Sequence, residues 1–418
     1  MKRAGESSKT APDFNVAISV LMARVLDVLL LALALSPMPA LAGGAGQGDG
    51  PWIAPVTAYP DDSITVRQLE NKLAALRGKS DREMAHEIAG IELSERLSTG
   101  KLEKLAQPLP GKRSAQALIA VADASAFLDL PESEQPRISM PDRLLQGEIV
   151  SRAADFVART VSKMPDFIAT KTTTRFQSVK HFNASEEPVI VIHRGFQFID
   201  RSEVITVYRD GNEVEETPQK GKAANGRNNI RGLHNTGIFG PLLASVMMDV
   251  LKGRIGWSHW EESIDGPAAV FRFAVPEDKS TYTVSFCCVS GRNASLSEFK
   301  ATPAYHGEIA INPNSGAIMR IVLKTDLKVG IELTRMDLAV DYGRATIGGR
   351  SFICPVRGVS IANVRELVKK PAPTAVGGSY MFTGGPMITA INDTRFDNYH
   401  QFRSDIKILP FDATAPSQ

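Results

Sequence analysis

The stretch YHGEIAINPNSGAIMRIVLKT, residues 305–325, decides the fold. Apolar side chains recur at every second position from Tyr305 to Ile311 and again from Ile318 to Thr325, which is the period of a β-strand. The run from Asn312 to Gly316 between them consists of Asn, Pro, Ser and Gly, which are turn-forming residues. The stretch therefore predicts two strands joined by a turn.

The same two-residue period continues through the second half of the chain. It predicts further strands at Phe167–Phe176, Glu203–Arg209, Trp257–Glu261, Ala269–Val275, Tyr282–Val289, Thr334–Tyr342, Ser351–Val359 and Thr389–Phe402. One helix, Leu242–Leu251, interrupts them. Because sheets of about ten strands seldom stay flat, the pattern predicts one large antiparallel sheet that curls, with this helix on its concave side.

The first half of the chain has helical spacing instead. Val66, Leu69, Leu73 and Leu76 lie on one face of a helix ending at Gly78. Ser80 and Glu83 then form a capping box for a second helix, which is expected to close near Gly100. Shorter helices are expected at 102–107 and 114–128. A long helix from Pro141 to Pro165 follows, with Leu144, Leu145, Ile149, Ala153, Phe156, Val157 and Val161 as its buried stripe.

The expected fold class is therefore α+β, with a helical domain at 61–164 and a domain at 165–410 formed by the large curled antiparallel sheet, followed by a tail at 411–418. The chain of 418 residues is long enough to bury a core without disulfide staples. Its 48 basic and 46 acidic residues are interleaved, giving a net charge of only +2. That balance argues against nucleic acid as a partner.

The N-terminus has the features of an export signal. An apolar run from Val28 to Leu35 precedes Pro37 and Pro39, and then the cleavage pattern Ala40-Leu41-Ala42. We expect a signal peptide at 1–42, with Met22 as the true start, followed by a flexible leader at 43–60. The run is too short to cross a bilayer, so no transmembrane span is expected after cleavage. The protein is expected to be exported, either periplasmic or secreted.

Export bears on the three cysteines, because an oxidising compartment favours disulfides. Cys287 and Cys288 are adjacent in a predicted strand, so only one of them can face Cys354. A bridge between Cys288 and Cys354 is slightly preferred, since Cys288 shares an apolar face with Phe286, and Cys287 is the alternative. Buried free thiols, or a reactive or metal-bound thiol, remain open.

No sequence motif for catalysis is present. The seven histidines are scattered, and no nucleophile elbow, phosphate-binding loop or metal-binding helix accompanies them. We therefore assign no catalytic residue, no metal site and no cofactor. His259, between Trp257 and Trp260, stands out, but a strand with one aromatic face and one polar face explains it without a function.

Several segments resemble a family of uncharacterised secreted bacterial proteins, mainly acidobacterial. They are Ser80–Ala85, Val121–Leu128, Gly237–Leu243, Trp257–Glu261, Ala269–Pro276, Tyr305–Ile309, Asp341–Gly343, Ile347–Arg350 and Asn392–Phe402. More distantly, the spacing of Gly, Ile and Pro from Gly307 to Ile318 is similar to that of periplasmic lipoprotein carriers. That resemblance implies a half-barrel that binds acyl chains or lipopeptides in its cavity.

Three functions remain open at this point. The first is an envelope binding module for a lipid, a lipopeptide or a protein partner, with Val246, Met247 and Val250 of the single helix lining an apolar cavity. In the alternative arrangement this helix simply fills the concave side of the sheet. The second function is an exported hydrolase, and the third is a structural or interaction protein without a ligand cavity. The absence of motifs makes the enzyme the weakest of the three.

Overall fold

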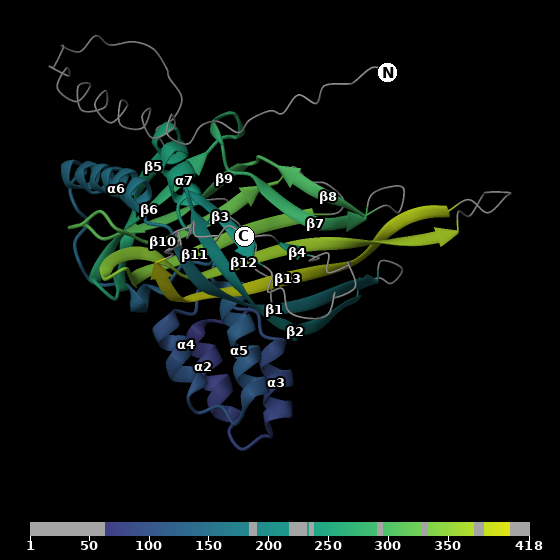
Figure 1. Ribbon diagram of the computed structural model, residues 1–418. Coiled ribbons are helices and arrows are strands. Elements are labelled where there is room, and N and C mark those ends of the chain that lie inside the picture. Colours follow the sequence, from purple (N-terminus) through teal and green to yellow (C-terminus); the bar gives the residue numbers. More distant parts are fainter. Residues whose placement is uncertain are drawn as a thin grey trace, which may run out of the picture.

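The computed structural model describes residues 63–183, 190–216, 232–233, 238–290, 296–327, 333–371 and 380–401 (Figure 1). The predicted signal peptide, the leader at 43–60 and the tail at 411–418 lie outside these ranges. Within them, helices and one large antiparallel sheet occupy separate parts of the chain, and the α+β class is confirmed.

Four helices form a small bundle at the start of the described chain. They are α2 (Val66–Ala75), α3 (Asp81–Ala89), α4 (Thr99–Ala106) and α5 (Lys112–Ser125). Capping boxes begin two of them, at Thr65 for α2 and at Ser80 for α3. Fully buried leucine and isoleucine side chains from these helices form the centre of the bundle: Leu69, Ile88 and Leu118.

The second helix is shorter than the sequence pattern predicts. It ends at Ala89, with Gly90 as its C-cap, instead of continuing toward Gly100. The chain beyond it is extended, because its backbone pairs with Ile64: Ile64 N donates to Glu92 O, and Ser94 N donates to Ile64 O, both at 2.9 Å. The apolar residues of this segment, Ile91 and Leu97 among them, are buried in the bundle core, but as extended chain.

Among the described residues, ten antiparallel strands form the main sheet, in the order β3-β2-β1-β13-β12-β11-β10-β9-β6-β5. The strands are β1 (Phe167–Asn183), β2 (Ile190–Arg209), β3 (Asn212–Glu216), β5 (Arg254–Ser263), β6 (Gly266–Val275), β9 (Ala304–Ile311), β10 (Ile318–Asp326), β11 (Leu333–Ile347), β12 (Arg350–Pro371) and β13 (Tyr380–Gln401). Strands β3 and β5 form two separate edges, so the sheet is open, and it is not strongly curled. The expectation that the sheet curls into a half-barrel is therefore wrong.

The stretch at 305–325 forms the β9–β10 hairpin that its pattern predicts. Ile311 pairs with Ile318, and the side chain of Asn312 accepts hydrogen bonds from the backbone N–H groups of Asn314 and Ser315, both at 3.0 Å. Gly316 adopts a positive φ of 74° in this turn. A Cβ at this position would also lie 2.3 Å from the carbonyl oxygen of Arg152, so glycine allows a helix to pass directly over the turn.

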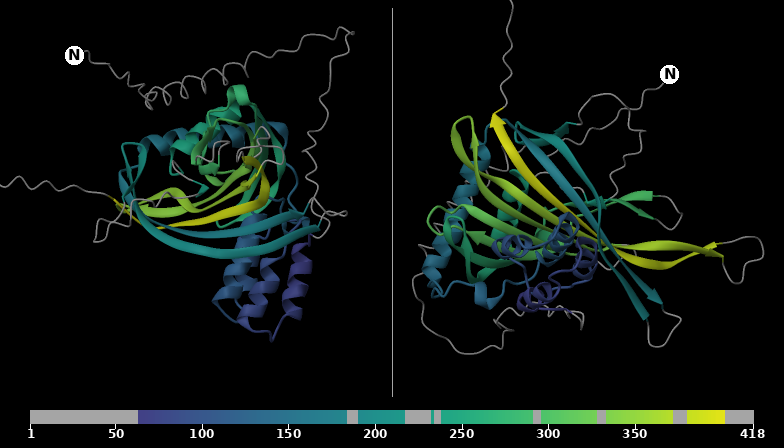
Figure 2. Two further views of the ribbon diagram at one scale, coloured as in Figure 1. Left: turned by 90° about the vertical axis from the view of Figure 1, so that its right-hand side faces the viewer. Right: turned by 90° about the horizontal axis from the view of Figure 1, so that it is seen from below.

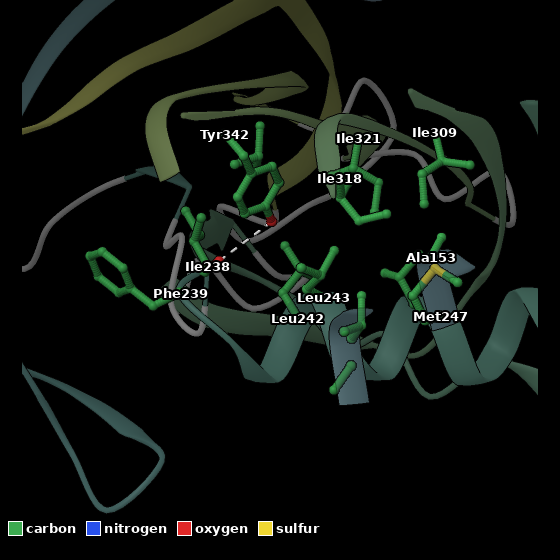
Figure 3. Close-up of a cluster of buried hydrophobic side chains, with 14 of the residues drawn as sticks. Ala153, Ile238, Phe239, Leu242, Leu243, Met247, Ile309, Ile318, Ile321 and Tyr342 are labelled. Atoms are coloured by element: carbon green, nitrogen blue, oxygen red, sulfur yellow. Dashed lines mark hydrogen bonds between the residues drawn. The ribbon is translucent and has the colours of Figure 1, made fainter. Parts of the chain in front are cut away.

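Two helices cover one face of the sheet, and the bundle covers the other (Figures 1 and 2). The first face carries α6 (Arg143–Lys163) and α7 (Pro241–Lys252). Their apolar side chains pack on those of β6, β9, β10 and β11 in the largest core (Figure 3). On the opposite face, Phe127 at the end of α5 packs with sheet residues such as Phe176 and Ile361.

A second, three-stranded sheet lies beside the main one. It consists of β4 (Gly232–Leu233), β7 (Val284–Ser290) and β8 (Leu296–Ala301) in the order β4-β7-β8. Val284 and Phe286 of β7 pack on Leu333, Met336 and Ala362 of the main sheet. Short 3-10 turns occur at Glu132–Glu134 and Glu277–Lys279.

The start of α6 differs from the prediction. Asp142 is the N-cap, its side chain accepting from Leu145 N at 2.8 Å, and the helix begins after Pro141. Leu144 and Leu145, which were expected in the buried stripe, are exposed, whereas Ile149, Ala153 and Val157 are buried. The contact with the sheet begins only at Ile149, so the first turn of α6 lies outside the core.

Candidate functional site

The three residues predicted to line a cavity on the single helix lie in the main core. Val246, Met247 and Val250 of α7 are at most 1% exposed. Met247 faces Ala153 of α6, and the neighbouring sheet positions are isoleucines (Figure 3). This packing matches the alternative in which the helix fills the side of the sheet that it covers.

Cys354, the shared partner in the predicted disulfide, lies on β12 in the same core. It is a free, fully buried thiol, and burial raises its pKa to about 12. A thiol with this pKa is almost entirely protonated near neutrality and is a poor nucleophile. The structure shows no disulfide at Cys354. The side chains of Cys287 and Cys288 lie outside the described part of the chain, so a bridge to either of them stays a prediction.

A pocket of about 150 Å³ lies where the bundle meets the sheet, on the face away from α7. It is lined by Ala85 of α3, Arg113, Gln116 and Ala117 of α5, Phe176 of β1, and Phe196 and Phe198 of β2. Phe176 is almost fully buried, whereas Phe198 is 44% exposed at the rim. The rings of Phe176 and Phe198 meet edge to face, with centroids 6.4 Å apart.

The geometry of the pocket depends on a close approach of β2 to the end of α3. A Cβ added to Gly195 would lie 2.3 Å from the carbonyl oxygen of Ala89, so only glycine lets the two backbones pass this closely. Lys180 of β1 forms an ion pair with Glu92 in the segment that follows α3. These contacts hold α3 against β1 and β2 and thereby fix the walls of the pocket.

The phenylalanines of β2 lie outside the strand that the sequence pattern predicts. That pattern predicts a strand only from Glu203 to Arg209, whereas β2 begins at Ile190. The alternation of Ile190, Ile192, Phe196 and Phe198 was the available signal. Arg194 and Gly195 interrupt this alternation. A glycine is expected where a strand passes close to another backbone.

Charged side chains of alternating sign run across the same face of the sheet. They follow neighbouring strands from β13 to β6: Asp393, Arg357, Asp341, Arg320, Glu308 and Arg272. We call this set the charge ladder. Directly paired members include Asp341 with Arg357 and Arg272 with Glu308. Opposite charges on adjacent strands stabilise a sheet, and burial makes each of them dependent on its partners.

One segment of the bundle binds the arginines of the charge ladder. Asp123 of α5 forms an ion pair with Arg357, the carbonyl oxygen of Ala126 accepts from Arg320 at 2.8 Å, and Asp129 accepts from Arg272 at 2.8 Å. These three residues are spaced by three, and the three arginines lie on alternate strands β12, β10 and β6. The segment thus crosses the sheet and fixes the bundle on it.

Burial at this contact shifts two ionisation equilibria. Asp123 is completely buried, and this burial together with the carboxylate of Asp393 raises its pKa well above the ordinary value. Burial alone would lower the pKa of Arg357, but Asp123 and Asp393 raise it. Arg357 therefore stays charged between two carboxylates, and its loss would leave them facing each other.

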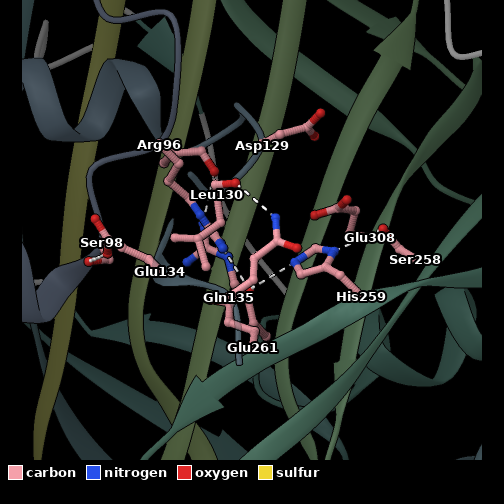
Figure 4. A network of polar contacts seen from close by, with 12 residues as sticks. Arg96, Ser98, Asp129, Leu130, Glu134, Gln135, Ser258, His259, Glu261 and Glu308 are labelled. Carbon is pink, nitrogen blue, oxygen red and sulfur yellow. Dashed lines mark hydrogen bonds and ion pairs between the residues drawn. The ribbon is translucent and has the colours of Figure 1, made fainter. Parts of the chain in front are cut away.

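His259 lies beyond the end of the charge ladder on β5, in a polar network with Arg96 and Glu261 (Figure 4). Arg96 Nη2 donates to Glu261 Oε2 at 2.6 Å, and His259 Nε2 lies 3.9 Å from the same oxygen. Burial alone would raise the pKa of Glu261, but His259 and Arg96 lower it to about 2. Glu261 is therefore a stable carboxylate that compensates the charge of buried Arg96.

The same network contains the residue types of a hydrolase triad. Ser258 Oγ lies 2.9 Å from His259 Nδ1, and Glu261 lies on the other side of the ring. In a triad the carboxylate orients the histidine and stabilises its protonated form, whereas here Arg96 binds the carboxylate of Glu261 directly. Leu130 and Gln135 from the linker after α5 lie beside the ring (Figure 4), and a hydrogen bond between them holds this linker. The geometry fits charge compensation better than catalysis.

A second buried carboxylate joins α7 to the sheet. Asp249 is fully buried and accepts hydrogen bonds from Tyr305 Oη at 3.0 Å and from Thr281 N at 2.7 Å. Burial, together with Asp249, raises the pKa of Tyr305 far above its ordinary range, so its hydroxyl stays a donor. Asp249 therefore has a structural role.

Among the residues that the structure describes, no helix combines the length and the apolar character that a bilayer span requires. In the same residues, no three His, Cys, Asp or Glu side chains are grouped so that they could hold a metal ion.

No protein-family model, no curated protein and no solved structure matches this chain. The resemblances to a secreted bacterial family and to lipoprotein carriers thus stay predictions. The site has to be interpreted from its own geometry.

Proposed function

We propose that this protein is an exported, non-enzymatic binding module of the bacterial envelope, and that its ligand places an apolar group in the pocket between the bundle and β1–β2. The observation that carries the proposal is the lining of this pocket by three phenylalanines beside Arg113. Apolar walls with few polar groups are typical of small-molecule sites.

The size of the pocket limits the ligand. A space of about 150 Å³ accommodates roughly one benzene-sized group. The pocket is therefore suited to an aromatic ring or the end of a short acyl chain, and a longer chain would continue over exposed Phe198. An apolar side chain of a protein partner has the same dimensions.

Arg113 gives the pocket a preference for ligands that carry a negative charge. Its backbone N–H donates to Asp81 at 3.1 Å, while its guanidinium forms no ion pair with any residue in the described ranges. A guanidinium beside an apolar pocket suits a ligand in which a carboxylate or phosphate follows the apolar group. Acyl chains and lipopeptides, the ligands implied by the resemblance to lipoprotein carriers, belong to this chemical class.

The expected half-barrel is not part of this proposal, because the main sheet is open and not strongly curled. The proposed pocket lies on the face of the sheet that the bundle covers, opposite α7. The ligand would thus be held between the bundle and the sheet.

The experiment compares ligands that differ in only one feature. Binding of phenylacetate and hexanoate, and of the neutral benzyl alcohol and hexanol, is measured by calorimetry on protein purified after export. Ala117→Leu fills the pocket and should abolish binding of all four compounds. Arg113→Gln should weaken only the two carboxylates, by about tenfold or more.

Arg82→Gln is the matched control, because Arg82 is an exposed arginine of α3 that does not line the pocket. It should bind all four compounds like the unmodified protein. Equal binding by unmodified protein and Ala117→Leu would overturn the proposed site. Native mass spectrometry followed by organic extraction then identifies any ligand that copurifies, and its loss from Ala117→Leu would place that ligand in this pocket.

A further inference from the structure

The most concentrated exposed apolar surface in the described chain lies where α6 begins. Four large apolar side chains occur within eight residues: Ile138, Met140, Leu144 and Leu145. Leu144 is 75% exposed and Met140 is 65% exposed. Single exposed apolar residues are ordinary, but several together on one short segment indicate an interaction surface. We call these four residues the α6 patch.

The α6 patch is held firmly by the structure on both sides. After it, Ile149 and Ala153 anchor α6 in the main core. Before it, the backbone carbonyl of Ser139 accepts a hydrogen bond from Trp260 Nε1 at 2.9 Å. Asp142 caps the helix between the two anchors. The patch is thus presented in a fixed shape, which reduces the entropy lost on binding.

The charge around the patch is positive. Arg137 and Arg143 flank Met140 in sequence, and both are exposed. Neither guanidinium forms an ion pair with the described residues. Of the nearby acidic groups, Glu148 is paired with Arg152 at 2.8 Å, whereas Asp142 keeps its negative charge while it accepts the hydrogen bond from Leu145 N. The balance of Arg137, Asp142 and Arg143 is therefore one positive charge. Two available arginines therefore surround the apolar side chains.

We infer that the α6 patch docks on the surface of a lipid bilayer that carries anionic headgroups, with Met140, Leu144 and Ile138 entering the headgroup boundary and Arg137 and Arg143 contacting phosphates. Apolar side chains flanked by basic ones are the combination that binds such interfaces, and here they come from the segment before α6 and from its first turn. This inference is independent of the ligand proposed for the pocket lined by Phe176, Phe196 and Phe198, which we call the phenylalanine pocket. No residue of the α6 patch lines that pocket.

The test is flotation with vesicles of phosphatidylcholine alone or of phosphatidylcholine mixed with phosphatidylglycerol. The protein is the full chain as cells process it, and every variant carries the same N-terminus. The unmodified protein should float with the anionic vesicles. The double variant Met140→Glu/Leu144→Glu should lose this binding, and Arg137→Gln/Arg143→Gln should bind about thirtyfold more weakly.

Val214→Glu is the matched control. Val214 is 54% exposed on β3, at the opposite edge of the sheet from β5 and its Trp260. This variant adds a negative charge at an exposed apolar position and should float like the unmodified protein. A second readout is the tryptophan emission, which should shift on adding anionic vesicles only when the α6 patch is intact, since the indole of Trp260 contacts the patch segment.

Three results would overturn the inference. One is equal flotation of all variants. Another is a dimer that Met140→Glu/Leu144→Glu converts to a monomer without any change in flotation, which would assign the patch to a second copy of the chain. The third is a lower melting temperature of the arginine variant without vesicles, which would assign the patch to a contact within the chain.

Discussion

At the scale of single residues, the buried charges of this protein depend on partners that are distant in sequence. Glu261 compensates Arg96, which lies 165 residues earlier in the chain. A lone buried guanidinium would be costly, and so would a lone buried carboxylate. The pair is tolerable because Glu261 also lies close to His259.

This arrangement predicts how stability depends on pH. Glu261 has a folded pKa of about 2, below its ordinary value of 4.5, so its stabilisation is present above about pH 4.5 and is lost as the pH falls toward 2. The complete loss, reached below pH 2, amounts to roughly 3 kcal/mol, from about 1.4 kcal/mol per pKa unit, and about 2 kcal/mol of it is lost by pH 3. Urea unfolding near pH 7 and near pH 3 measures it.

Glu261→Gln is the comparison variant. It should be less stable than the unmodified protein near pH 7, because Arg96 loses its counter-charge, and the difference should shrink at acidic pH. Glu298→Gln, at an exposed glutamate of β8, is the control and should leave the pH dependence unchanged. An equal loss of stability at both pH values in Glu261→Gln would contradict the ionic role of Glu261.

His259 shows how far single residues could be interpreted from sequence. Its position between two tryptophans was visible, and the aromatic face exists: the rings of Trp257 and Trp260 meet at 5.1 Å. Its polar neighbours Arg96 and Gln135 could not be identified, because they belong to the bundle and its linker and reach β5 only through the tertiary fold.

At the scale of secondary-structure elements, the strand period and the turn residues were sufficient to place the β9–β10 hairpin. The helical spacing of apolar residues was sufficient to place α7. These patterns were insufficient where a segment's partner decides its conformation, as in the extended chain after Ala89 that pairs with Ile64. The α6 helix illustrates the same point, because its apolar period continues through Leu144 and Leu145 although the sheet ends before them. Periodicity reports which face is apolar, but not how much of that face is covered.

The crossing of β2 over the end of α3 gives a prediction at this scale. Gly195→Ala should push the two backbones apart, since the new Cβ would lie 2.3 Å from Ala89 O. We expect a destabilisation of about 1–3 kcal/mol, as in other overpacked sites, and a weaker affinity for ligands of the phenylalanine pocket. Thermal unfolding and calorimetry measure the two effects.

Gly256→Ala serves as the control for this substitution. Gly256 is also a strand glycine, on β5, and its added Cβ would meet nothing within 4 Å. The stability of the Gly256→Ala variant should change little, and its affinity for ligands of the pocket should not change. If Gly195→Ala behaves in the same way, then the contact between β2 and α3 does not shape the pocket.

At the scale of the whole molecule, the bundle and the sheet are joined through charges as well as apolar contacts. Arg357 lies at the centre of this junction, between Asp123 of the bundle and Asp393 of the sheet. Such a junction could not be predicted from sequence, because alternating charges on strands resemble an ordinary solvated face until another unit covers them. The unit that covers them is the bundle expected at 61–164, except that its last helix, α6, packs on the opposite face of the sheet.

Arg357→Met should therefore loosen the bundle. Removing one partner from a buried ion pair costs about 3–5 kcal/mol, and here two carboxylates lose their counter-charge. Hydrogen exchange should show a loss of protection in α2 to α5 that exceeds the loss in β9 to β11. The exposed pair Lys79 and Glu87 is the control, since Lys79→Met should change exchange very little. Uniform loss of protection over both parts would contradict a local role for Arg357.

The position of β13 in the sheet also determines the order in which the protein can fold. Lys171 of β1 pairs with Phe396 of β13, 225 residues later in the chain. Strands β1 to β3 are made early, yet they join β12 and the strands beyond it only through β13, the last strand of the described chain to be synthesised. Until it emerges, β1 and β12 each keep an unpaired edge, and closing so long a loop is slow. A nascent chain of this protein therefore needs protection from aggregation until its final residues are available, and truncation before Tyr380 would divide the sheet into two pieces.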